Sequence, residues 1–226
     1  MADTIERRRG SRAKYASRAM LERRQRMIAV ALQMIEEGGV AAFNVRTLCE
    51  RAEVSPRTLY YTFGSKEDLL VAAIEQHFQG FTDKLPSPAS LSDLEAVLFE
   101  LEAIADITVR EHRYAAAMVE VFFARGGGGG LREDLMRMAV GRVARKDDGL
   151  TSRISVAELE ATRSLMINAG YANVGDFVFG RISEKTFRLR AQINALTIGF
   201  RLFRPKVRTQ AKEILNRLFE ELASAG

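Results

Sequence analysis

Apolar residues recur at three- and four-residue steps along nearly the whole chain after residue 19, and this helical period limits the possible folds more than any other feature. No stretch shows convincing β-alternation, and no internal repeat appears. The 226 residues are enough for one large domain or two small ones with a sizeable core. We therefore expect an all-α fold.

One predicted helix, residues 186–203, carries two apolar stripes. The first runs through Leu189 and Leu196, and the second through Ala195 and Leu202. A helix that is apolar on two faces is buried on two sides. This segment is therefore predicted to lie either at the centre of the fold or in a subunit interface.

Composition excludes several classes of protein. A single Cys cannot form an intramolecular disulfide framework or a cysteine-based zinc cluster, and two His argue against a multi-histidine metal site. The apolar runs are too short for a transmembrane helix, and the basic N-terminal segment has no apolar stretch behind it that would mark a secretory signal. We expect a soluble, cytoplasmic protein with no membrane partner, no metal and no cofactor.

Positive charge is concentrated at the N-terminus. Residues 1–26 hold nine basic and three acidic side chains, whereas the rest of the chain sums to −1. Such a cluster attracts a polyanion, although a solvated tail has the same composition.

Residues 43–70, FNVRTLCERAEVSPRTLYYTFGSKEDLL, predict two short helices joined by a tight turn and followed by a third helix. Asn44 stands at an N-cap position, Ser55-Pro56 starts the second helix, and Ser65 with Asp68 forms a capping-box signature. This is the helix-turn-helix pattern, in which the second helix enters the DNA major groove. Two ordinary helices of a bundle would show similar stripes, so the pattern alone is moderately specific.

The segment SPRTLYYTFGSKEDLL, behind a basic amphipathic helix, resembles the signature of the tetracycline-repressor (TetR) family of bacterial transcription regulators. The resemblance covers roughly residues 20–70. It implies an all-α homodimer that binds double-stranded DNA at a palindromic operator and responds to a small-molecule effector. It also implies four parts: a basic flexible arm (1–19), a helix-turn-helix domain (20–66), a linking helix (67–84) and a ligand-binding and dimerisation domain (85–226).

The resemblance assigns the DNA contacts residue by residue. The chemistry agrees, because hydroxyls, guanidinium groups and aromatic side chains reach base edges and phosphates. The DNA-facing positions are Arg46, Thr47, Ser55, Pro56, Arg57, Thr58, Tyr60, Tyr61, Thr62 and Lys66. Two positions depart from the family: Glu53 replaces the usual turn Gly, and Thr62 replaces a longer side chain. A left-handed backbone at Glu53 would carry roughly 1 kcal/mol of strain.

The effector site is predicted from apolar side chains in the C-terminal helices and from one histidine of the linking helix. Apolar residues at helical spacing are more often plain core, and a histidine is more often solvated, so these positions are hypotheses. They are His77, Met118, Phe122, Met166, Tyr171 and Phe177. Cys49 is expected in the core and not as a redox sensor. The five glycines of residues 126–130 are expected to form an exposed connection, with a gating role as an open alternative.

We expect a ligand-responsive, sequence-specific transcriptional regulator, most simply a repressor, located in the cytoplasm and on the nucleoid when bound to DNA. Two alternatives remain: a constitutive DNA-organising or adaptor protein without a ligand, and a helical enzyme fused to a helix-turn-helix. The sequence contains none of the common catalytic motifs, which argues against an enzyme.

Overall fold

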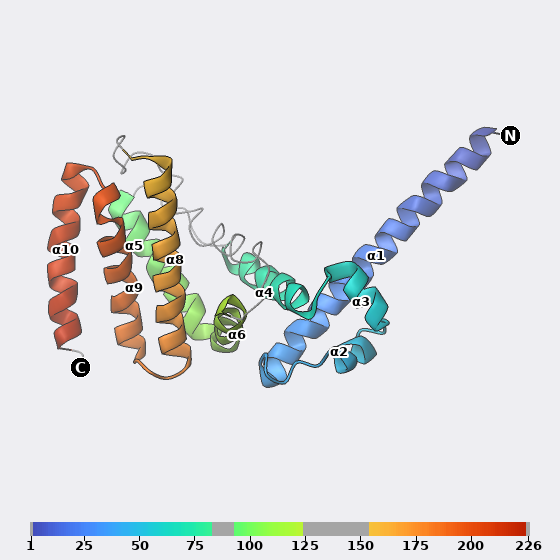
Figure 1. Cartoon of the computed structure of the whole chain (residues 1–226), viewed down its shortest axis with the longest axis horizontal. Helices are drawn as coiled ribbons and strands as arrows, with labels where there is room; N and C mark the ends of the chain where they lie inside the picture. Colours follow the sequence, from blue (N-terminus) through green and yellow to red (C-terminus); the bar gives the residue numbers. More distant parts are fainter. Residues whose placement is uncertain (1, 83–92, 124–153, 225–226) are drawn as a thin grey trace. The chain divides into compact units, whose positions relative to one another are not determined.

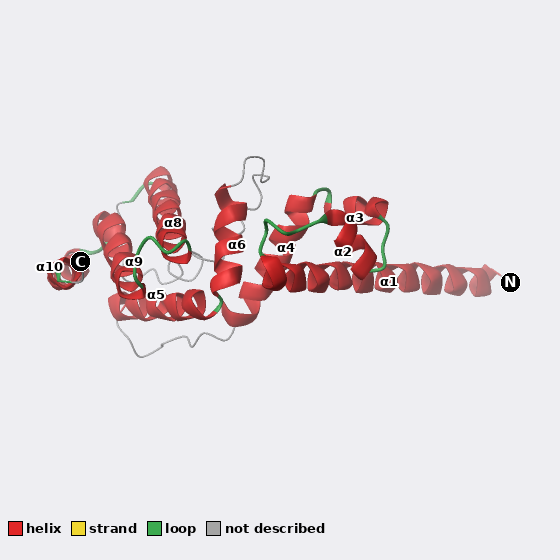
Figure 2. Ribbon diagram, turned by 90° about the horizontal axis from the view of Figure 1, so that it is seen from below, coloured by secondary structure: helices red, strands yellow, loops and turns green. Residues whose placement is uncertain are grey.

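The computed structural model describes residues 2–82, 93–123 and 154–224. Within these ranges the chain forms helices joined by short loops and contains no β-strand (Figure 2). The all-α prediction is confirmed. The sequence also predicts a linker at residues 85–88 and a helix that starts at Leu131. Both of these segments and the glycine run at 126–130 lie outside the described residues.

The chain divides into two compact units, Met1–His77 and Phe78–Gly226, and each is described separately. The N-terminal unit holds three helices and most of a fourth (Figure 1). These are α1 (Ala2–Gly38), α2 (Val45–Arg51), α3 (Pro56–Phe63) and α4 (Lys66–Thr82). The division falls within α4, inside the segment predicted to be the linking helix.

The core of the N-terminal unit is built from one apolar stripe of each helix. The side chains at its centre have 5% of their surface exposed or less: Met27, Ile28, Ile35, Leu48, Cys49, Leu59, Leu70 and Ile74. Burial raises the pKa of the Cys49 thiol, with a smaller contribution from the neighbouring carboxylate of Glu50. Cys49 is therefore a core residue, as the apolar stripe predicts.

α1 is longer than the apolar pattern indicates. It is one continuous helix that begins at Ala2 and includes the residues predicted to form a flexible arm (Figure 1). The mobility of residues 1–19 in the absence of DNA stays a prediction.

The C-terminal unit contains five α-helices and one 3₁₀ turn among its described residues. These are α5 (Asp93–Arg110), α6 (His112–Phe123), α8 (Val156–Val178), α9 (Glu184–Gly199), η1 (Phe200–Leu202) and α10 (Pro205–Ala223). The apolar pattern of the sequence predicts the last helix over Thr209–Ala223, with Arg204-Pro205 as a break before it. α10 starts four residues earlier, because Pro205 occupies the first helical position.

α9 lies at the centre of this unit. It packs between α8 and α10, with α5 against it as well (Figure 1). Its Leu189, Ile193 and Leu196 join Leu94 of α5 and Leu218 of α10 in one buried cluster. Helices of the same chain therefore bury the first stripe of α9, whereas Ala191, Ala195 and Ile198 of the second stripe are half-buried.

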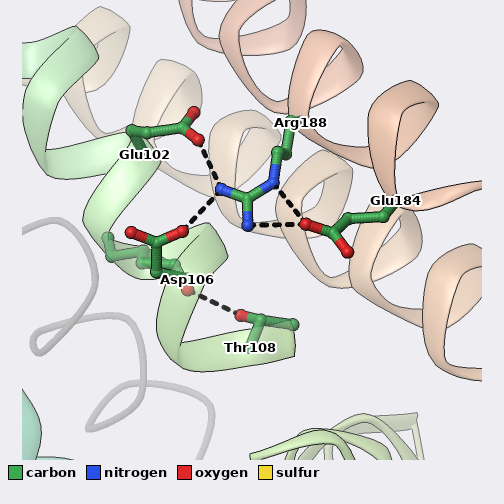
Figure 3. Close-up of polar contacts among 6 residues, drawn as sticks. Glu102, Asp106, Thr108, Glu184 and Arg188 are labelled. Atoms are coloured by element: carbon green, nitrogen blue, oxygen red, sulfur yellow. Dashed lines mark hydrogen bonds and ion pairs between the residues drawn. The ribbon is translucent and has the colours of Figure 1, made fainter. Parts of the chain in front are cut away.

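A polar cluster joins α5 to α9 beside this core. Arg188 of α9 donates hydrogen bonds to Glu102 and Asp106 of α5 and to Glu184 of its own helix (Figure 3). The hydrogen bonds raise the pKa of Arg188, and they outweigh the opposing effect of burial. Arg188 therefore stays charged and fixes two helices through three carboxylates.

No helix in the described ranges is both long and apolar enough to cross a membrane. Among the same residues, no cluster of three or more His, Cys, Asp or Glu side chains is arranged to hold a metal ion.

Candidate nucleic-acid interface

α3 is a two-turn helix whose start is fixed by its own sequence. Ser55 caps it, because the Ser55 Oγ atom accepts a hydrogen bond from the Thr58 backbone N–H at 3.2 Å, and Pro56 fills the first helical position. The hydroxyls of Ser55 and Thr58 also lie 2.9 Å apart. The N-terminal end of α3 is thus pre-formed, as the Ser55-Pro56 pair predicts.

One face of α3 is buried and the other is open. Leu59 is fully buried, whereas 49% of Tyr60 and 81% of Tyr61 remain exposed. Arg57 is also exposed, and its guanidinium group makes no ion pair within the described part of the chain. An exposed cation beside two exposed phenol rings can bind base edges and phosphates without first breaking an internal contact.

α2 presents Arg46 and Thr47 from its first turn. Asn44 caps this turn, since its side-chain oxygen accepts from the backbone N–H groups of Arg46 at 2.8 Å and Thr47 at 3.3 Å. The Arg46 Nε atom pairs with Glu50 at 3.0 Å, but the Arg46 side chain is 88% exposed. Exposed pairs of this kind contribute about 0.3–0.5 kcal/mol, so Arg46 can exchange Glu50 for a nucleic-acid group at little cost.

Thr62 and Lys66 are engaged within the protein. The Thr62 hydroxyl donates to the Thr58 carbonyl at 2.7 Å. The Lys66 ammonium donates to the Phe43 carbonyl at 3.3 Å and lies 5.4 Å from the centre of the Phe43 ring. Lys66 therefore ties the start of α4 to the segment before α2, a role that the sequence analysis missed because the partners are 23 residues apart.

The turn between α2 and α3 contains a left-handed residue. Glu53 has φ of 53°, and it is the only non-glycine residue with positive φ in the described part of the chain. The Val54 N–H bonds the Cys49 carbonyl at 3.0 Å and closes the turn. The backbone at Glu53 is therefore left-handed, which was the condition under which the sequence predicted backbone strain at this residue.

Two contacts hold α2 and α3 against α1. Arg51 of α2 forms an ion pair with Glu37 of α1 at 2.7 Å. The Arg24 guanidinium of α1 lies over the Phe63 ring of α3, 5.3 Å from its centre. Neither contact could be predicted from the sequence, because both depend on how the helices cross.

The side chains predicted to bind an effector do not form a single cluster. Phe122 of α6 and Tyr171 of α8 stack with ring centres 3.8 Å apart. Phe177 instead stacks on Phe187 of α9 at 4.7 Å, and His112 meets its edge at 5.6 Å. The Met166 methyl group lies against Gly199 of α9, close enough that a Cβ there would come within 3.1 Å of it.

Met118 is half-buried on α6, and His77 is half-buried in the other unit. The structure therefore brings Phe122 and Tyr171 into direct contact. The effector-binding role of all six residues stays a prediction.

α8 also carries two buried polar groups that the sequence analysis did not identify. Asn173 donates from Nδ2 to the Phe187 carbonyl at 2.9 Å, but its Oδ1 atom is buried without a hydrogen bond in the described part of the chain. The Nε atom of Arg163 is likewise buried without a partner there. Only the packing reveals these atoms, because a single Asn or Arg in a helical pattern gives no signal of its own.

Comparisons with known proteins agree with the helix-turn-helix arrangement of α2 and α3. A family model described as bacterial regulatory proteins, tetR family, matches residues 27–73, from the middle of α1 into α4. The transcriptional repressor KstR of Rhodococcus jostii (strain RHA1) is 33% identical over 107 residues, which are 47% of this chain and 50% of that protein. The transcriptional regulator UidR of Escherichia coli (strain K12) is 28% identical over 98 residues, 43% of this chain and 49% of that protein. The chain spans half or less of the length of the curated relatives it matches.

Two solved structures share the fold. A TetR transcriptional regulator from Rhodococcus sp. RHA1 superposes with a TM-score of 0.60 at 19% identity, covering 76% of this chain and 95% of that one. A tetR-family transcriptional regulator from Streptomyces coelicolor gives 0.56 at 16% identity, covering 90% of this chain and 89% of that one. At these identities the likeness concerns the fold alone.

Proposed function

The chain belongs to the TetR family of bacterial regulatory proteins, and on that premise we propose that it is a sequence-specific, DNA-binding regulator of transcription. The observation that carries the proposal is α3, a capped two-turn helix whose open face offers Arg57, Tyr60 and Tyr61. A helix of this kind enters the major groove with its N-terminal residues at base edges.

We divide the interface between base and backbone contacts. Arg57 and Arg46 are proposed to read bases, because a guanidinium fork matches the acceptors of guanine. Tyr61, whose side chain is 81% exposed, is proposed to bind a phosphate. The rest of the proposed interface is Thr47, Ser55, Pro56, Thr58, Tyr60, Thr62 and Lys66.

A homodimer is proposed as the active form, since a two-fold symmetric protein reads a palindrome with half-sites about 34–36 Å apart. The outer face of α8 supports this. Ala157, Ala161, Leu165 and Ala172 are all exposed, carry no charge and lie at helical spacing. An exposed stripe without charges is typical of a surface that is covered in the assembly. We assign α8 as the main dimer helix.

We further propose that a small, largely apolar effector binds in the C-terminal unit and releases the protein from its operator in the cytoplasm. The relatives named as repressors support a repressor over an activator. An effector can act only by favouring a conformation that binds DNA less well, and coupling of about 1–3 kcal/mol is typical. The rival function is a constitutive DNA-organising protein, which requires no effector.

The experiment is selection of bound fragments from a random duplex library, followed by genomic footprinting with the purified full chain. The proposal predicts one palindromic motif and footprints upstream of a limited set of genes. Binding without any enriched motif would contradict sequence-specific regulation. A motif whose affinity no small molecule lowers would favour the constitutive alternative.

A further inference from the structure

The N-terminal part of α1 carries the whole positive excess of the chain. Residues 1–19 hold six basic and two acidic side chains, and residues 20–26 add three basic side chains and one acidic one. The remaining 200 residues sum to −1. The family model starts at residue 27, so this charge lies outside the segment that is matched to the family. The helix-turn-helix therefore does not account for it.

α1 connects this charged segment to the helix proposed to read DNA. Met27 and Ile28 anchor α1, because both are fully buried in the core of the N-terminal unit. The Arg24 guanidinium lies 5.3 Å from the centre of the Phe63 ring of α3. From there the same helix continues past α3 towards the N-terminus (Figure 1). Residue 19 is thus only five residues from a contact with α3.

The cations at the inner end of this segment are available to an external anion. Arg23 and Arg26 are exposed and form no ion pair in the part of the chain that the structure describes. Arg18 pairs with Glu22 at 3.0 Å, but the two side chains are 80% and 64% exposed. An exposed pair of this kind is weak, so Arg18 can exchange Glu22 for a phosphate.

The composition of residues 1–19 favours DNA over a lipid surface as the partner. A helix that lies on a membrane needs an apolar face of Trp, Phe or Leu opposite its basic face, and residues 1–19 contain none of these three. Their only large apolar side chains are Met1, Ile5 and Tyr15. DNA requires only the charge, since each contact of Lys or Arg with a phosphate releases bound counter-ions.

We propose that residues 1–19 form a second DNA-binding surface, which contacts phosphates of the duplex that flanks the site read by α3. This inference rests on the proposed function and adds a sequence-independent contact to it. The segment supplies the charge that draws the protein to a polyanion, because the chain beyond residue 26 has a net charge of −1. A helical segment of this length spans about 28 Å, or roughly eight base pairs of duplex.

The test compares the full chain with a variant that lacks residues 2–19, by titration on the selected site at several salt concentrations. The deletion should lower the slope of log K against log salt by about two to five, because each phosphate contact contributes about 0.9. The preference for the selected site over singly altered sites should stay unchanged, since α3 is intact. An unchanged preference also shows that the shortened protein is folded.

The length of the duplex gives a second readout. One duplex ends at the palindrome, and the other carries about ten further base pairs on each side, which exceeds the reach of the segment. The full chain should bind the longer duplex several-fold more tightly at low salt. The shortened variant should bind the two duplexes alike, and it controls for the non-specific sites that any longer duplex adds.

Charge-matched variants separate the position of the charge from its amount. One variant replaces three arginines of the segment: Arg7→Gln, Arg8→Gln and Arg9→Gln. It should lower the slope by about one to three. The control removes the same charge from three exposed positions of α10: Lys206→Gln, Lys212→Gln and Arg217→Gln. It should leave the slope unchanged.

The inference is overturned if the deletion lowers the slope by less than about two, or if the shortened variant keeps the preference for the longer duplex. It is also overturned if the α10 control lowers the slope as much as the Arg7–Arg9 variant. Binding to phosphatidylserine vesicles that the deletion abolishes, with the DNA slope unchanged, would assign the segment to a lipid surface instead. In each of these cases a selected palindrome leaves the proposed function standing, whereas the absence of any selected motif contradicts that function itself.

Discussion

Glu53 shows how a single backbone angle affects this domain. Its φ of 53° is unfavourable for any residue with a Cβ, whereas Gly adopts it without strain. We predict that Glu53→Gly raises the free energy of unfolding by about 0.5–1 kcal/mol, measured by urea denaturation. Gln76→Gly, at an exposed position inside α4, should lower it by about 1 kcal/mol. An equal loss in both variants would show that Glu53 is not strained.

Cys49 gives a prediction that depends on pH. Burial raises its pKa above the ordinary value of 9.0, so the unfolded chain ionises first as the pH increases. The free energy of unfolding should therefore fall as the pH rises above about 9, and this loss should be absent in Cys49→Ala. Near neutral pH, Cys49 should react with a thiol reagent only in urea. Rapid labelling of the native protein would place the thiol at the surface.

At the residue level, the sequence predicted the contacts that are local. The caps by Asn44, Ser55 and Ser65 follow from short-range spacing, and each is present in the structure. The bond from Lys66 to the Phe43 carbonyl and the unpaired Arg163 could not be predicted. They depend on how elements distant in the sequence pack.

Among the elements, α9 is the helix that the others pack against in the C-terminal unit. Arg188 connects it to α5 through Glu102 and Asp106. We predict that Arg188→Met lowers the free energy of unfolding by about 1–2 kcal/mol, because three carboxylates lose their shared cation on a partly exposed surface. Denaturation at low and high salt is the measurement, and the loss should shrink as salt screens the repulsion.

Arg181→Met is the control for this cluster. Within the described part of the chain, Arg181 forms an ion pair only with Asp176, and its side chain is 68% exposed. Its removal should cost less than 1 kcal/mol. A loss as large as that of Arg188→Met would mean that the carboxylate cluster has no special role in joining α5 to α9.

Helix boundaries were less predictable than helix existence. The apolar period predicted helices along the chain, but it placed the start of α1 near residue 20 and the start of α10 at Thr209, whereas the two helices begin at Ala2 and Pro205. Charged residues such as those at 7–9 carry no apolar period, so a pattern of apolar residues cannot extend a helix through them. The double stripe of α9 left two interpretations open because burial by the same chain and by a partner gives the same pattern.

For the whole molecule, the proposed dimer rests on the uncharged outer face of α8. We predict that Leu165→Glu shifts the protein from dimer to monomer at micromolar concentration, because it buries a carboxylate in the proposed interface. Sedimentation velocity is the measurement. Phe99→Glu, at an exposed apolar position on α5, should leave the dimer intact. A dimer that tolerates Leu165→Glu would exclude this face.

The central claim is that the open face of α3 reads DNA sequence, and binding titrations on the selected site and on singly altered sites test it most directly. Wild type, Arg57→Ala and Tyr61→Phe are compared at several salt concentrations. Arg57→Ala should cost about 1–3 kcal/mol and relax the preference at one position per half-site, whereas Tyr61→Phe should weaken all sites alike. If Arg57→Ala keeps the full preference and Tyr61→Phe alters it, the account of α3 is contradicted.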